Sequence, residues 1–138
     1  MSSLRKRVAA MLTVAASITG LAIATAPSAS AAGSAPYNGA CGSGYSVIDS
    51  LPLTGGIVYL TYSGATGKNC VVTIRNTAGS PIGISAWVSR ADGTGYDSDG
   101  GQYTTYAGPV YVSAPGTCIN WGGTFNESSD YRVNSHCG

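Results

Sequence analysis

Short runs of β-branched and aromatic residues, separated at close intervals by glycine, proline and asparagine, restrict the fold of this chain more than any other feature. No segment of 41–138 shows the 3.6-residue apolar period of an amphipathic helix. The run 82–89 alternates strictly, so that Ile84, Ala86 and Val88 share one face and Trp87 lies on the other. The pattern predicts an all-β fold of about seven or eight strands, arranged as a small antiparallel β-sandwich or, alternatively, a small barrel.

The first thirty or so residues do not fit this β pattern. Basic residues at 5–7 precede an uncharged apolar run at 8–26, and Ala29-Ser30-Ala31 has the small-residue form of a cleavage site. These features predict a helical signal peptide at 1–31, cut after Ala31 or, less favoured, after Ala32. A membrane anchor is the alternative, which the Thr, Ser and Gly within the run disfavour. We therefore expect a secreted protein with a flexible N-terminal arm at 32–40 and one disulfide-stabilised domain at 41–138.

Removal of the leader changes the charge of the protein. The whole chain carries seven Lys and Arg against six Asp and Glu. Three of the basic residues belong to the leader, so the exported part has a net charge of −2. A weakly acidic chain without a basic patch is not expected to bind nucleic acid, and no second apolar run suggests a membrane contact after cleavage.

All four cysteines follow the leader: Cys41, Cys70, Cys118 and Cys137. An even number in a small exported domain predicts two disulfides, for which three pairings are possible. We favour Cys41–Cys70 and Cys118–Cys137, because Cys118 opens one strand and Cys137 closes the last one. A zinc site is disfavoured, since no two cysteines have metal-ligand spacing and the chain has one histidine.

The stretch 106–123 contains a Gly-Pro bend, an alternating strand, a Pro-Gly turn and a second strand that ends in Trp-Gly-Gly. We interpret it as a β-hairpin that organises the domain. Pro109 cannot donate to a ladder, so it marks a bend or a sheet edge.

Catalytic chemistry has few candidates. His136 is the one possible histidine base, but it adjoins a half-cystine and no G-x-S-x-G elbow is present. The single Glu and the turn-located Asp residues do not suggest a glycosidase pair. We therefore expect no enzymatic activity, no catalytic residue and no cofactor.

Two binding possibilities remain. Asp92, Asp97 and Asp99 crowd one glycine-rich loop and form a weak calcium candidate, although the EF-hand pattern fails. Tyr and Trp rings suit sugar faces or protein interfaces, whereas cross-strand packing is their ordinary use. The candidate binding aromatics are Trp87, Trp121, Tyr106 and Tyr111.

Several stretches, in order along the chain, resemble the spore-associated protein A family, small exported proteins of filamentous spore-forming bacteria. They are 35–45 (APYNGACGSGY), 58–62 (VYLTY), 66–73 (TGKNCVVT), 106–111 (YAGPVY), 118–123 (CINWGG) and the final Cys137-Gly138. The resemblance implies export and association with a spore or cell surface, and it supplies no catalytic residues. We expect a structural or adhesion protein whose partner is the spore or cell-wall surface. The alternative is a carbohydrate- or peptidoglycan-binding module that uses exposed Trp and Tyr.

Overall fold

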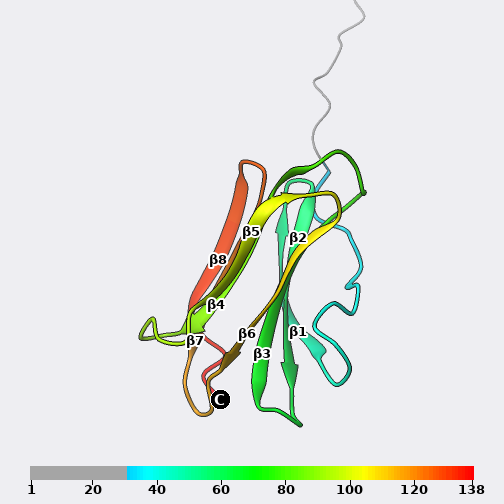
Figure 1. Ribbon diagram of the computed structural model, residues 1–138. Helices are drawn as coiled ribbons and strands as arrows, with labels where there is room; N and C mark the ends of the chain where they lie inside the picture. Colours follow the sequence, from blue (N-terminus) through cyan, green and yellow to red (C-terminus); the bar gives the residue numbers. More distant parts are fainter. Residues whose placement is uncertain (1–30) are drawn as a thin grey trace, which may run out of the picture.

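A computed structural model describes residues 31–138, and the predicted signal peptide lies outside the described residues except for Ala31. Two four-stranded antiparallel sheets face each other (Figure 1), in the orders β1-β2-β3-β6 and β5-β4-β7-β8. This confirms the sandwich and its strand number. The strands are β1 Ser46–Leu53, β2 Gly56–Ser63, β3 Lys68–Arg75, β4 Ile82–Arg90, β5 Asp97–Tyr103, β6 Tyr106–Ser113, β7 Ile119–Phe125 and β8 Ser128–Ser135. Across residues 31–138 no helix has the length and hydropathy of a membrane span.

The core between the sheets follows the alternation of the strands. Ile84, Ala86 and Val88 of β4 are buried, as the sequence predicts. Ala86 and Val88 form a single apolar cluster with Val58, Leu60 and Val71 of the other sheet. Burial of such side chains contributes about 25 cal/mol for each Å² of apolar surface, and this term drives the two sheets together.

The predicted hairpin at 106–123 is wrong. β6 pairs with β3 in one sheet, whereas β7 pairs with β4 and β8 in the other. The Pro115-Gly116 turn therefore carries the chain from one layer to the next. Turn residues show that two strands are close in sequence, but they do not show whether the strands pair or cross between layers. Pro109 does lie on an edge strand, beside a register shift opposite Val71 and Thr73.

Two edge strands contain residues that disfavour β-structure. β1 continues through Pro52 to Leu53, and this proline is tolerated because β1 is an edge strand. β5 occupies Asp97–Tyr103, so Asp97 and Asp99 lie on a strand and not in the glycine-rich loop where we expected them. Asp, Ser and Gly disfavour strands, so this edge strand has no signal in the local sequence.

Both disulfides have the favoured pairing, Cys41–Cys70 and Cys118–Cys137. The second joins the ends of β7 and β8, which pair antiparallel with Ile119 opposite Ser135. The first joins β3 to the segment that precedes β1.

That segment lies along the outer face of the β1-β2-β3-β6 sheet (Figure 1). We expected residues 32–40 to form a loose arm, but Ala35 is buried and its carbonyl accepts a hydrogen bond from the Tyr59 hydroxyl at 2.5 Å. The Asn76 side chain accepts from the N–H of Ser34 and donates to the carbonyl of Ala32. The chain thus covers one outer sheet face with its own N-terminal segment.

Candidate functional site

The outer face of the β5-β4-β7-β8 sheet carries three neighbouring aromatic rings. Trp87 comes from β4, Tyr131 from β8, and Tyr96 immediately precedes β5. The ring centroid of Trp87 lies 6.4 Å from that of Tyr96 and 6.4 Å from that of Tyr131, with interplanar angles of 25° and 43°. Tyr96 and Tyr131 are 62% and 60% exposed. We call these three residues the aromatic strip.

Strand register explains why rings from β4 and β8 meet across the intervening β7. Gly122 pairs with Trp87 on one side and with Tyr131 on the other. A Cβ at Gly122 would lie 2.6 Å from the Cβ of Tyr131. The absence of a side chain at this position therefore leaves room for the two rings to approach each other.

A shallow groove of about 270 Å³ adjoins the strip on the same sheet. Ser85 precedes Trp87 by two residues on β4, so their outward side chains lie about 7 Å apart along the strand. Polar neutral side chains, glycines and Ile84 line the groove, and the Ser85 and Thr124 hydroxyls bond to each other. We call it the polar groove; its polar side chains are Ser85, Gln102, Thr124 and Asn126, beside Gly83, Gly100 and Gly101.

The opposite sheet uses its tyrosines differently. Tyr111 packs edge-on against Tyr45 with centroids 5.7 Å apart, and its hydroxyl donates to the carbonyl of Cys41 at 3.0 Å. Burial raises the pKa of the Tyr111 phenol, and the nearby Tyr45 and Tyr37 add to this effect. Tyr111 therefore holds the N-terminal segment in place, and its proposed use as a ligand-binding ring needs correction.

Trp121 also needs correction as a candidate binding ring. Its side chain is 0% exposed in the core, where Nε1 donates to the Ser135 hydroxyl at 3.1 Å. Side chains alternate along β7, so Trp121 faces inward and Gly122 faces outward. Tyr106 is 37% exposed but lies on β6 of the other sheet, away from the aromatic strip. Of the four predicted aromatics, Trp87 alone belongs to the strip.

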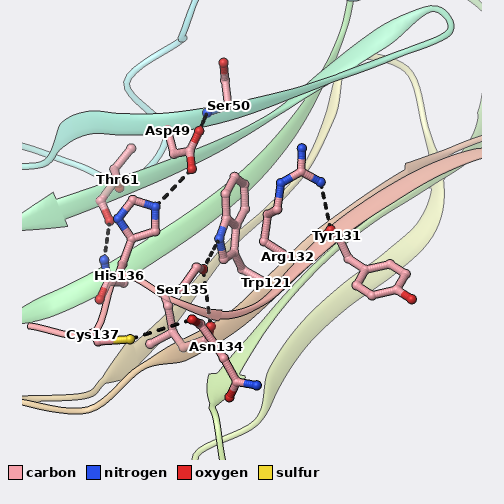
Figure 2. Close-up of polar contacts among 12 residues, drawn as sticks. Asp49, Ser50, Thr61, Trp121, Tyr131, Arg132, Asn134, Ser135, His136 and Cys137 are labelled. Carbon is pink, nitrogen blue, oxygen red and sulfur yellow. Dashed lines mark hydrogen bonds and ion pairs between the residues drawn. The ribbon is translucent and has the colours of Figure 1, made fainter.

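A second hollow, of about 430 Å³, lies at one end of the sandwich. Ile48 and Tyr62 line one side and Pro115 and His136 another. His136 Nε2 lies 3.0 Å from Oδ2 of Asp49, which joins the C-terminal segment to β1 (Figure 2). No hydroxyl or thiol among residues 31–138 forms a hydrogen bond with this imidazole. A histidine and carboxylate without a nucleophile do not complete an acyl-transfer triad.

The calcium candidates have internal partners instead. Asp97 and Asp99 accept backbone N–H groups of β6, and Asp92 accepts from the backbone and hydroxyl of Thr94. These Thr94 bonds lower the pKa of Asp92. Within residues 31–138 no three His, Cys, Asp or Glu side chains gather where a metal ion could be held. The three carboxylates therefore do not form the suggested loop site.

Sequence reasoning missed Tyr96 and Tyr131 as partners of Trp87. Tyr131 is forty-four positions from Trp87, and the two meet only through the β4-β7-β8 register. Tyr96 stands in a polar loop that offers no periodicity. The outward position of Trp87 was the available signal, and it indicated the correct face.

Comparison with known proteins supports the earlier resemblance. No protein-family model and no solved structure matches the chain. The chain is 48% identical to spore-associated protein A of Streptomyces coelicolor over 135 residues, which cover 95% of this chain and 88% of that relative. Such identity over nearly the whole length of the chain shows common ancestry. The chain belongs to the spore-associated protein A family.

Proposed function

We propose that this protein is an exported, non-enzymatic component of the spore or cell surface that adheres through the aromatic strip. The single observation that carries the proposal is the open outer face of the β5-β4-β7-β8 sheet, with Tyr96 and Tyr131 more than half exposed beside Trp87. Exposed rings of this kind favour contact with another surface, because they bury large apolar area at low cost in side-chain entropy.

The difference between the two outer faces supports an adhesive use of this one. The N-terminal segment and Cys41–Cys70 cover the outer face of the β1-β2-β3-β6 sheet. Nothing among residues 31–138 covers the rings of the aromatic strip in the same way. The relative's name, spore-associated protein A, agrees with a location at the spore.

A structural role without catalysis is supported by the use of the ionisable groups. Asp97 and Asp99 accept hydrogen bonds from the backbone of β6, and His136 pairs with Asp49 of β1. None of these ionisable groups is paired with a nucleophile beside the aromatic strip. The two disulfides suit a protein that operates outside the cell.

Retention on intact spores tests the proposal. The full chain, expressed with its leader and recovered from the culture medium, is incubated with washed spores, and the bound fraction is measured. We expect the Trp87→Ala and Tyr131→Ala double variant to lose most of its retention. Tyr106→Ala is the matched control, because it removes a partly exposed ring from the other sheet. Circular dichroism establishes that each variant is folded. Equal retention of the double variant and the natural chain would overturn adhesion through the strip.

A further inference from the structure

We infer that the aromatic strip and the polar groove together bind a neutral, extended polysaccharide of the β-1,4-linked type. The inference rests on the proposed function, since it names the ligand class of the same sheet face. It depends on three observations: the continuity of strip and groove, the absence of charge in the groove, and the rigidity of the strand positions.

Continuity follows from the register. Trp87 lies between Ser98 and Gly122, and the next outward row consists of Gly100, Ser85 and Thr124. Gln102 stands opposite Gly83 in the row after that. Rings, hydroxyls and an amide therefore follow one another along β4 on one face, and a single extended ligand can contact all of them.

The chemistry of this face matches that of a hexose chain. A sugar ring whose hydroxyls are equatorial presents apolar C–H faces above and below, and hydroxyls around its edge. The aromatic rings can take the C–H faces, while Ser85, Thr124 and Gln102 can donate to and accept from the hydroxyls. Glycines at positions 83, 100 and 101 let the ligand approach the backbone closely.

The charge of the polar groove favours a neutral glycan over an anionic one. The side chains that line the polar groove carry no charge. Asp97 and Asp99 point toward β6, where they bond its backbone. On β8 the charges of Arg132 and Asp130 neutralise each other at 3.1 Å. A polyanion would find no unpaired cation in the groove, and a polycation no free carboxylate.

The positions are also fixed before a ligand arrives. Trp87, Ser85 and Thr124 stand on paired strands of the sheet, and the Ser85 and Thr124 hydroxyls hold each other. Such preorganisation reduces the entropy that binding must overcome. A straight, ribbon-like β-1,4-linked chain fits a face of this kind better than a curved α-linked chain.

Titration of the exported protein with soluble hexasaccharides tests the inference. The probes are cellohexaose and chitohexaose, with α-linked maltohexaose as the shape control and carboxymethylcellulose as the charged control. We expect one or both β-linked hexasaccharides to shift backbone amide signals along β4 and β7 and to alter the fluorescence of Trp87. Maltohexaose should leave both unchanged, and carboxymethylcellulose should bind at least tenfold more weakly than cellohexaose.

Variants assign the binding to named residues. Trp87→Ala should weaken binding at least tenfold, Trp87→Phe should restore part of it, and Gln102→Ala should weaken it several-fold. Tyr131→Ala, at an exposed position, provides a ring deletion with little risk to the fold. Tyr106→Ala should bind as the natural chain does.

The outcomes separate this inference from the proposed function. If spores retain the protein through the strip but neither neutral hexasaccharide binds, the glycan inference is overturned and adhesion stands. If maltohexaose binds equally, or if Trp87→Ala binds as well as the natural chain, the inference is also overturned. If the glycans bind through Trp87 and spores do not retain the protein, the proposed spore adhesion fails and the glycan site stands.

Discussion

The carboxylate of Asp97 on β5 accepts a hydrogen bond from the backbone N–H of Tyr111 on β6 at 2.9 Å, across the boundary between the two sheets. Asp99 does the same for the N–H of Gly108 at 2.7 Å. β6 is an edge strand, so these donors have no strand partner on that side. The carboxylates on the edge strand of one sheet thus accept hydrogen bonds from the N–H groups on the edge strand of the other sheet. These bonds close one side of the sandwich.

Removal of this bridge should weaken the fold. We expect Asp97→Ala to lower the free energy of unfolding by about 1–2 kcal/mol, because it leaves the Tyr111 N–H without its acceptor. Asp97→Asn keeps an acceptor oxygen and should cost less. Urea denaturation of both variants measures the difference. Equal stability of Asp97→Ala and the natural chain would show that water replaces the carboxylate without cost.

The two tryptophans should respond differently to truncation. Trp121→Ala removes a fully buried side chain and should cost about 3–5 kcal/mol of stability. Trp87→Ala should cost much less, since its ring lies on the outer face. Single-tryptophan variants report the same difference by fluorescence, with acrylamide quenching Trp87 and leaving Trp121 protected. Equal quenching of the two would contradict the burial of Trp121.

Gly123 should not tolerate a side chain. A Cβ there would lie 2.6 Å from the carbonyl oxygen of Ser85 and still closer to the Thr73 hydroxyl, where the two sheets face each other. We expect Gly123→Ala to lower the thermal midpoint by several degrees, because a sheet must move to make room. Gly64→Ala is the matched control, since nothing lies within 4 Å of its added Cβ. The prediction fails if the two variants melt at the same temperature.

Reduction of Cys41–Cys70 should release the N-terminal segment. The disulfide closes a loop with a sequence separation of 29, for which the chain-entropy model gives about 3–4 kcal/mol. We expect Cys41→Ser with Cys70→Ser to lower stability and to increase hydrogen exchange at residues 35–45 more than in β4 or β7. Uniform exchange changes across the domain would contradict a local role for this bond.

Alkaline pH should destabilise the protein through its tyrosines. Burial raises the pKa values of Tyr59 and Tyr111, and the hydrogen bond to Asp99 raises that of Tyr103. Each raised value favours the neutral phenol in the folded state. The corresponding stability is therefore complete below the unfolded value near 10 and is lost as pH rises through the higher folded values. Ultraviolet titration should show some of the nine tyrosines ionising late. Tyr103→Phe should remove one late group, and simultaneous ionisation of all nine would contradict this account.

The correct parts of the sequence-based prediction came from two signals, the alternation of apolar residues and the positions of the cysteines. The 82–89 run identified the inward and outward faces of β4, including the outward Trp87. Cys118 and Cys137 were paired correctly because each adjoins an end of a strand. The 106–123 stretch was misjudged because a tight turn is compatible both with a hairpin and with a crossing between layers.

The sequence by itself determined the all-β class and the family, because these depend on residue type, local period and identity along the chain. It favoured one of three disulfide pairings, and the structure has that pairing. Only the tertiary structure decided which aromatic rings are available. Trp121 is buried and Tyr111 secures the N-terminal segment, whereas Tyr96 and Tyr131 join Trp87 on an open face. The physical reason is that exposure of a ring depends on which strands pair and which sheets face each other, and these contacts join residues far apart in the chain.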